Sequence, residues 1–390
     1  MKNGLEDYYI IKDHKKLRYG YTTGSCAAAA SGAAALMLLS GKTVERVDLM
    51  TPKGILLHLE ILDIRIGKEE ASCAVRKDGG DDPDATDGLL VYASVRKTPE
   101  SGIHIDGGEG VGRVTKKGLE QPVGAAAINS TPRAMIESEV RKSAELCCYD
   151  GGLSVVISIP GGAQIAAKTF NPRLGIEGGL SVLGTSGIVI PMSEEALISS
   201  IRTEMGLRQA NGGGYLLVTP GNYGEAFLRT YPGIDTSDSV KCSNYVGETL
   251  DHAVNLGIRG LLFVAHIGKF IKVSGGIMNT HSRCADSRAE LMAAAAIRAG
   301  ADLETARRIL GTVTTDEALD ILIEKGLLED AMKDITGRIR YYLQHRCQGA
   351  IETEAILFSN VHGLLGQTEG AETMLKRFQK DDLPGENEER

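Results

Sequence analysis

Residues 215–224 read YLLVTPGNYG: a short run of apolar, β-prone residues leads into a Pro-Gly-Asn turn. The same order of strand, turn and helix recurs twice between residues 239 and 269, and one more strand-like segment, 354–359, follows a helical region at 285–346. Short apolar strands that alternate with helices predict a mostly parallel sheet with helices on both faces. We therefore predict a three-layer α/β, Rossmann-like domain over residues 193–377.

Polar residues follow three of the predicted strands, at the turns that lead into the helices. These turn residues are Gly221, Asn222, Ser243, Asn244, Gly268 and Lys269. Ligands of open α/β sheets bind beyond the carboxyl ends of the strands, so the turns are candidate binding residues. Tight-turn geometry alone would explain any one corner, but three such corners at one edge make a binding site an equally good interpretation. Neither a Gly-x-Gly-x-x-Gly sequence after a strand nor a P-loop sequence occurs, which argues against a dinucleotide site of the usual kind.

The composition is typical of a globular enzyme, with 390 residues, 42% hydrophobic and 24% charged. A net charge of −8 argues against nucleic acid or an anionic membrane as a partner. Of the seven cysteines, none forms a Cys-x-x-Cys pair and none has zinc-ligand spacing with His, so we expect no protein metal site and a cytoplasmic location. We expect no signal peptide and no stretch that approaches the length of a membrane span.

The N-terminal half is predicted to be an α+β domain, residues 1–192, with a long Gly-rich loop at its end. Within it, residues 18–40 read RYGYTTGSCAAAASGAAALMLLS, a turn followed by a helix of small residues that begins near Ser25. Free N–H groups at that helix start, beside Thr22, Thr23 and Ser25, would suit a carboxylate, a phosphate or a carbonyl oxygen. Helix capping by Thr23 or Ser25 would need only one of these hydroxyls.

Residues 279–283, NTHSR, form a second polar cluster before a helix that holds Asp286 and Arg288. Arg283 offers a planar fork for a carboxylate, and His281 could move a proton near neutral pH. Capping by Thr280 or Ser282 would use only one member of this cluster, so we favour a functional interpretation.

Residues 77–86, KDGGDDPDAT, form an acidic turn that lacks the spacing of a calcium loop. A solvated turn is one interpretation. A contact to ribose hydroxyls or to a cationic group through Asp81, Asp82 or Asp84 is the other. The remaining segment, 378–390, is a polar tail that we expect to be disordered.

Several long motifs carry a family resemblance. They are LRYGYTTGSCAAAAS from Leu17, KDGGDDPDATDG from Lys77, GVGRVTKKGL from Gly110, TFNPRLGIEGGLSVLGTSGIVIPMSEEAL from Thr169, KCSNYVGE from Lys241, HIGKF from His266 and GIMNTHSRCADSRAE from Gly276. In this order, over residues 17 to 360, the chain resembles the cobalt-precorrin-5B C(1)-methyltransferases, the CbiD family of anaerobic vitamin B12 synthesis. Asp87 stands where the family more often has His.

The resemblance implies transfer of a methyl group from S-adenosylmethionine to C1 of cobalt-precorrin-5B, which gives cobalt-precorrin-6A. The cobalt belongs to the substrate, and other enzymes of cobalamin synthesis are possible partners. Because the tetrapyrrole bears many carboxylates, we expect cations and N–H donors to anchor it: Thr22, Thr23, Ser25, Arg173, Lys269, Asn279, Thr280, Arg283 and Arg288. For the methyl donor we expect Gly221, Asn222, Ser243 and Asn244, with Asp81, Asp82 and Asp84 as alternatives. His281 is the candidate general base.

Two other functions stay open on the residues alone. A nucleotide- or phosphate-binding transferase fits the Gly-rich loops and helix starts. A non-catalytic carrier that shields a tetrapyrrole intermediate is the second.

Overall fold

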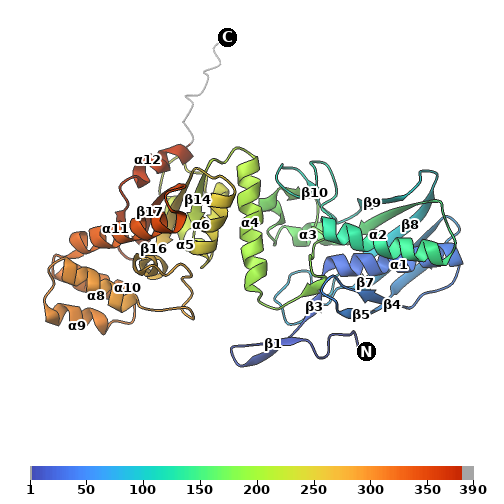
Figure 1. The fold of residues 1–390 in the computed structure, drawn as a ribbon, viewed down its shortest axis with the longest axis horizontal. Coiled ribbons are helices and arrows are strands. Elements are labelled where there is room, and N and C mark those ends of the chain that lie inside the picture. The colour runs from blue at the N-terminus through green and yellow to red at the C-terminus, as the bar shows by residue number, and fades with distance from the viewer. Residues whose placement is uncertain (1, 380–390) are drawn as a thin grey trace, which may run out of the picture. The chain divides into compact units, whose positions relative to one another are not determined.

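The computed structural model describes residues 2–379, and the predicted tail at 378–390 lies outside the described residues from 380 onward. The chain divides into two compact units, Met1–Glu194 and Glu195–Arg390. Both units mix helices with sheets, as predicted, and each is described by itself (Figure 1).

The first unit is built on a five-stranded sheet in the order β6-β7-β8-β11-β9. Its strands are β6 (Leu62–Ile66), β7 (Glu70–Arg76), β8 (Leu90–Thr98), β9 (Ile103–Gly107) and β11 (Gly152–Ser158). All neighbours pair antiparallel except β11 and β9, which are parallel. Helix α1 (Thr23–Ser40) packs on β7 and β8, and α2 (Ser130–Leu146) lies beside α1 (Figure 1).

Small residues let α1 and α2 approach each other closely. A Cβ on Gly32 would lie 3.0 Å from the Glu139 Cβ of α2, and Ser143 Oγ donates to the Gly32 carbonyl at 2.9 Å. The expectation that no stretch approaches the length of a membrane span is wrong. Judged by length and composition alone, α1 could cross a membrane. Of that helix, 83% is buried, and its residues form part of the core of the first unit.

Short elements complete the first unit. They are β1 (Tyr9–Lys12), β2 (Lys15–Arg18), β3 (Gly20–Tyr21), β4 (Arg46–Met50), β5 (Leu56–Glu60), β10 (Arg113–Val114), α3 (Gly162–Ala166), η1 (Asn171–Leu174), β12 (Ile176–Glu177) and β13 (Ile188–Val189). The predicted Gly-rich loop is therefore an ordered chain of short elements. Its last strand, β13, pairs antiparallel with β3 just before α1.

The second unit is built on a sheet in the order β15-β14-β16-β17-β18. Its strands are β14 (Tyr215–Thr219), β15 (Val240–Lys241), β16 (Gly260–His266), β17 (Glu352–Ser359) and β18 (Gly363–Gln367). The first four in the sheet are parallel, and β18 pairs antiparallel with β17. The carboxyl ends of four strands therefore meet at one edge.

Helices cover both faces of this sheet (Figure 1). They are α4 (Glu194–Ala210), α5 (Asn222–Leu228), α6 (Val246–Asn255), α7 (Ile267–Phe270), α8 (Arg288–Arg298), α9 (Leu303–Leu310), α10 (Thr315–Glu324), α11 (Leu328–Cys347) and α12 (Ala371–Leu375), with η2 (Thr236–Asp238), η3 (Ile271–Gly275) and η4 (Lys376–Phe378). Along β16, Leu261 and Phe263 belong to one buried cluster with α6, α8 and α11, whereas Leu262 and Val264 belong to another with α5 and α12. This alternation follows from the twofold period of a strand.

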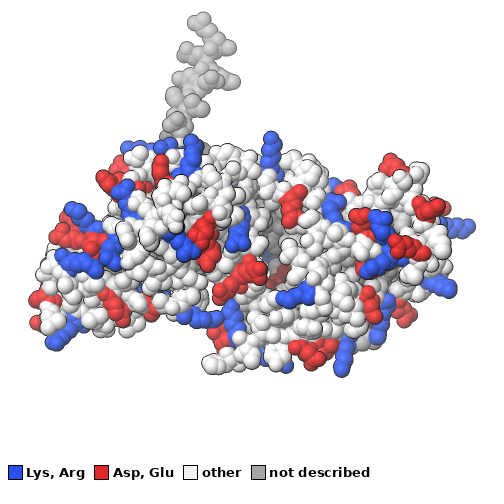
Figure 2. Space-filling model, in the orientation of Figure 1, with Lys and Arg blue, Asp and Glu red and all other residues white. Residues whose placement is uncertain are grey.

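Positive and negative side chains are interspersed over the face of the molecule in Figure 2. With a net charge of −8, the chain as a whole does not attract an anionic ligand. Local cations and N–H groups must therefore bind any such ligand.

Candidate functional site

The start of α1 is closed by contacts within the first unit. The helix is capped by Thr22, not by Thr23 or Ser25, because the Thr22 hydroxyl accepts from the Ser25 N–H. Gly24 N–H donates to the Leu183 carbonyl at 3.2 Å, and the Ser25 hydroxyl donates to the Gly187 carbonyl at 2.7 Å. The prediction of free N–H donors here is wrong for Gly24 and Ser25, because Leu183 of the Gly-rich loop accepts from the Gly24 N–H and the Thr22 side chain accepts from the Ser25 N–H.

The acidic turn is bound to the segment that precedes α1. Arg18 makes a bidentate ion pair with Asp78, at 2.6 and 2.9 Å, and its backbone N–H donates to Asp81. Burial alone would raise the pKa of Asp78, but Arg18 and the Gly80 N–H outweigh it, and the pKa is lowered. A Cβ on Gly20 would lie only 2.3 Å from the Asp78 carbonyl oxygen, so the two segments touch through backbone.

The other carboxylates of the acidic turn are also occupied. Asp84 accepts from the buried Lys77 ammonium at 2.6 Å and from both the N–H and the hydroxyl of Thr86. Asp82 accepts from Met192 N–H at 2.7 Å. These side chains hold the loop in place, which weakens the alternative assignment of Asp81, Asp82 and Asp84 to a ligand.

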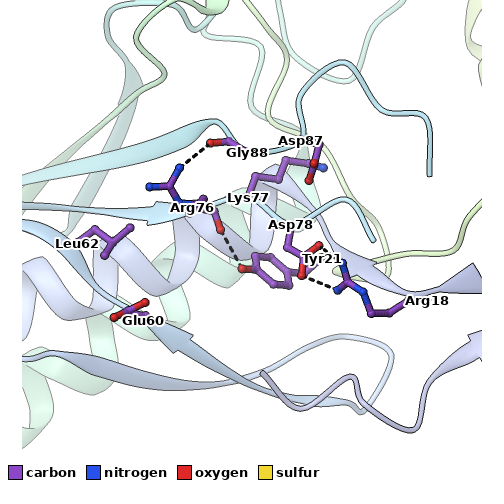
Figure 3. Close-up of a pocket in the computed structure, with 9 residues that line it drawn as sticks. All are labelled: Arg18, Tyr21, Glu60, Leu62, Arg76, Lys77, Asp78, Asp87 and Gly88. Atoms are coloured by element: carbon purple, nitrogen blue, oxygen red, sulfur yellow. Dashed lines mark hydrogen bonds and ion pairs between the residues drawn. The ribbon is translucent and has the colours of Figure 1, made fainter. Parts of the chain in front are cut away.

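An open cavity of about 360 Å³ lies beside this ion-pair cluster (Figure 3). Its lining residues are Arg18, Tyr21, Glu60, Leu62, Arg76, Lys77, Asp78, Asp87 and Gly88. Tyr21 donates to the Arg76 carbonyl at 2.8 Å, and burial raises the pKa of its phenol. Glu60 and Leu62 could not be predicted as lining residues of this cavity, because they come from a different part of the chain.

Arg173 lies in η1 of the same unit, half-buried. Gly175, at φ 64°, ends this turn, and the side chain of buried Asn171 accepts from the Ser181 hydroxyl at 3.0 Å. The loop that carries Arg173 is thus ordered by its own side chains.

In the second unit, the turn after β14 is shaped by two glycines. Gly221 has φ 103° and ψ −168°, a conformation that side-chain-bearing residues rarely adopt. A Cβ on Gly224 would lie 2.6 Å from the Val264 carbonyl oxygen of β16. Residues 219–224, TPGNYG, therefore place glycines at the last two positions of the Gly-x-Gly-x-x-Gly pattern, with Thr219 at the first.

The Thr219 hydroxyl is buried and has no hydrogen-bond partner among the described residues. The nearest group to a Cβ built on Gly221 is the Lys269 ammonium, at 4.0 Å, so this side of the turn is open and next to a cation. Lys269 is exposed and makes no ion pair with any residue in the described range 2–379. The turn can approach a ligand through its backbone.

The predicted methyl-donor residues at the end of β15 meet the predicted tetrapyrrole residues. Thr280 N–H donates to the Asn244 carbonyl at 3.0 Å, and the two side chains lie 3.4 Å apart. Asn279 forms an isolated antiparallel bridge with Tyr245. Ser243 takes φ 51°, in the left-handed region, at this corner. The structure thus brings 243–244 and 279–283 into one cluster.

The polar groups of residues 281–288 make specific contacts. His281 Nδ1 accepts from the Arg283 N–H at 3.1 Å, so the neutral ring carries its proton on Nε2. Both side chains are exposed. Arg288, which we predicted as a cationic anchor for the tetrapyrrole, makes a bidentate ion pair with Asp286, at 2.5 and 3.0 Å.

His266, which the sequence analysis did not select, ends β16 at the same sheet edge. Its Nδ1 accepts from the Gly268 N–H at 3.1 Å, and its ring lies 5.8 Å from that of exposed Tyr223. Burial lowers the pKa of His266, although Asp316 opposes the shift, so the ring is neutral near pH 7. The position after a buried strand was the signal that could have identified it.

The comparisons with known proteins agree over nearly the whole chain. Family models match at residues 10–191 (CbiD) and 279–369 (CbiD, C-terminal domain). The cobalt-precorrin-5B C(1)-methyltransferase of Ruminiclostridium cellulolyticum is 49% identical over 383 residues, 97% of this chain and 99% of that protein. The chain belongs to the CbiD family. A CbiD relative of the same name from Thermoanaerobacter sp. is 45% identical over 93% of this chain and 98% of its own length.

A crystal structure of the cobalamin biosynthesis protein (cbiD) from Archaeoglobus fulgidus is similar to this chain at 28% identity, with a TM-score of 0.39. The match covers 70% of this chain and 86% of the Archaeoglobus fulgidus chain. The sequence relatives confirm the CbiD membership that the motifs predicted.

Proposed function

We propose that this chain methylates C1 of cobalt-precorrin-5B, with S-adenosylmethionine as the donor, in anaerobic cobalamin biosynthesis. The observation that carries the proposal is the 49% identity with a cobalt-precorrin-5B C(1)-methyltransferase over 99% of that enzyme's length. Similarity that extends across both units makes a lone carrier module or an unrelated nucleotide-binding transferase a weaker interpretation.

The methyl donor is assigned to the carboxyl edge of the second unit's sheet, which we regard as Rossmann-like. Three observations support this place: the open backbone at Gly221, the unpartnered buried hydroxyl of Thr219 and the nearby Lys269 ammonium. A carboxylate such as that of the donor's methionine part would pair with Lys269. Asn222 and Asn244 supply amide groups on the two neighbouring corners.

The tetrapyrrole is assigned to residues 279–283, next to the donor residues. Arg283 and the His281 Nε2–H are exposed and carry the donors that carboxylates accept from. Arg173 lies in the first unit, and its assignment as an anchor stays a prediction from the sequence. The closed start of α1 and the Arg288–Asp286 pair give Thr22, Thr23, Ser25 and Arg288 structural contacts instead.

The bound donor supplies an electrophilic methyl group, which C1 of the ring attacks as the carbon–sulfur bond breaks and a neutral thioether leaves. The chain supplies no nucleophile, in agreement with Cys26, whose burial raises its pKa to about 12. Its residues contribute by holding the substrate and by matching charge at the transition state. Nδ1 of His281 accepts from the Arg283 N–H and would have to release it before taking a proton. This geometry favours a role as a hydrogen-bond donor, through Nε2–H, over the role of general base.

Calorimetric titration tests the donor assignment with S-adenosylmethionine, S-adenosylhomocysteine and ATP. We expect the first two to bind and ATP not to bind. Tight ATP binding alone would instead favour the nucleotide-dependent transferase.

Two variants test the assignment of residues 279–283 to the tetrapyrrole and not to the methyl donor. His281→Ala and Arg283→Ala should both weaken tetrapyrrole binding, and so lower turnover, while S-adenosylmethionine binding is kept. Unchanged turnover in His281→Ala would remove this residue from the mechanism. A loss of donor affinity alone in Arg283→Ala would reverse the assignment.

A further inference from the structure

Lys272 is a buried lysine whose charge no carboxylate neutralises directly. It lies in η3 and is 3% exposed. It makes no ion pair with any residue in the range 2–379 that the structure describes. Because burying an ammonium group is costly, hydrogen bonds must replace the water that it loses.

Those hydrogen bonds join two points of one loop. The Lys272 ammonium donates to the Thr280 carbonyl at 3.2 Å and to the Ala285 carbonyl at 2.8 Å. Residues 281–284, with His281 and Arg283, lie between these carbonyls. The ammonium group therefore links the two ends of the segment that carries the exposed side chains of His281 and Arg283.

The same loop is fixed on its other side by backbone contacts to the corner after β15. Gly247 N–H donates to the Met278 carbonyl at 3.1 Å, and Thr280 N–H donates to Asn244. Thr280 is thus held from both sides, through its N–H and its carbonyl, whereas Ala285 is held by Lys272. Loss of the lysine would release the C-terminal half of the loop first.

We propose that Lys272 is a positioning residue for methyl transfer, which fixes residues 280–285 so that His281 and Arg283 are held in place for the carboxylates of the tetrapyrrole. The assignment of this loop to the tetrapyrrole rests on the proposed function. Lys272 itself is buried and acts through the two carbonyls, not by touching the substrate.

Lys272→Met removes the donors and keeps an unbranched side chain, and Lys333→Met, at an exposed lysine of α11, is the matched control. We expect amide exchange of residues 281–287 to become about tenfold faster in Lys272→Met, and the KM for the tetrapyrrole to rise by about tenfold or more. The KM for S-adenosylmethionine should stay within about twofold of the wild-type value. Lys333→Met should change none of the three.

Native exchange in residues 281–287 together with an unchanged KM for the tetrapyrrole would overturn the proposal. A rise in both KM values with exchange that increases throughout the second unit would also overturn it, since that is the result of general destabilisation. If Lys272→Met does not fold, amide exchange in the wild type decides: slow exchange at residues 283–285 without ligand is expected, and exchange at unstructured rates refutes the proposal. Failure of the proposed function can be told apart from failure of this proposal, because in the first case even the wild type would form no methylated product.

Discussion

Gly224→Ala tests how closely α5 packs on the sheet at the edge to which we assign the methyl donor. The added Cβ would lie 2.6 Å from the Val264 carbonyl oxygen and 2.9 Å from the Thr219 Cβ. Both neighbours belong to paired strands of the sheet, so they cannot easily move. We therefore expect α5 to be displaced from the sheet.

The size of the effect follows from these distances. Since ordinary contact begins near 3.4 Å, relief of a 2.6 Å contact needs a shift of roughly 0.8 Å (3.4 − 2.6). Overpacking costs about 1–3 kcal/mol, of which the better helix propensity of Ala recovers up to about 1 kcal/mol. We expect a net loss of about 1–2 kcal/mol in the free energy of unfolding. Because Gly221 and Asn222 lie only three and two residues before Gly224, the affinity for S-adenosylmethionine should fall by about tenfold or more.

The matched control is Gly337→Ala in α11 of the same unit, where an added Cβ meets no atom within 4 Å. This variant should be stabilised by about 0.5–1 kcal/mol, with normal donor binding. Urea unfolding followed by circular dichroism and calorimetric titration with S-adenosylmethionine measure the two effects. If Gly224→Ala matched the wild type in both, the close packing of α5 and its role in donor binding would be refuted.

Three further results are expected. Cys284 is exposed beside Arg283, whereas burial raises the pKa of Cys242 to about 12. A thiol reagent at pH 8 should therefore label Cys284 in the native protein and Cys242 only after unfolding. Bound tetrapyrrole should slow the labelling of Cys284. Equal rates with and without the tetrapyrrole would argue against its assigned place. Asp84→Asn leaves the buried Lys77 ammonium without its counter-charge. The free energy of unfolding should fall by about 2 kcal/mol, which is less than for a fully buried pair because the Asp84 side chain is 24% exposed. Burial alone would raise the pKa of Asp84, but Lys77 and Thr86 outweigh it and the pKa is lowered. The carboxylate therefore stabilises the fold above its unfolded pKa of about 3.9, and this contribution is lost as the pH falls through the folded value. The stability difference between wild type and Asp84→Asn should shrink below about pH 4, and a constant difference down to about pH 2 would contradict this reasoning.

Local sequence signals were sufficient to predict the four parallel strands of the second unit. Tyr215–Thr219 is apolar, β-prone and ended by Pro-Gly, and β14 has those bounds. The edge strand β18 was not predicted, because its GLLGQ sequence has little β-branched character and depends on pairing with β17. The start of α1 was misplaced because Thr22, Thr23 and Ser25 each carry a hydroxyl that could cap it, and in the fold the Ser25 hydroxyl instead donates to Gly187 of the Gly-rich loop.

The candidate site was predicted as separate segments. The chemistry of residues 279–283 and of Asn244 can be read from the residue types. Their contact cannot, because 36 positions separate Thr280 from Asn244 and only the fold brings them together. Similarly, sequence shows an acidic turn but not that Lys77, Arg18 and Met192 already occupy its carboxylates.

The most direct test of the account is an anaerobic reaction of the full chain with cobalt-precorrin-5B and S-adenosylmethionine labelled with carbon-13 in the methyl group. We predict one labelled methyl per tetrapyrrole, at C1, with release of one S-adenosylhomocysteine for each methyl transferred. No labelled product under conditions in which both ligands bind, or a label on another ring carbon, would contradict the assigned function.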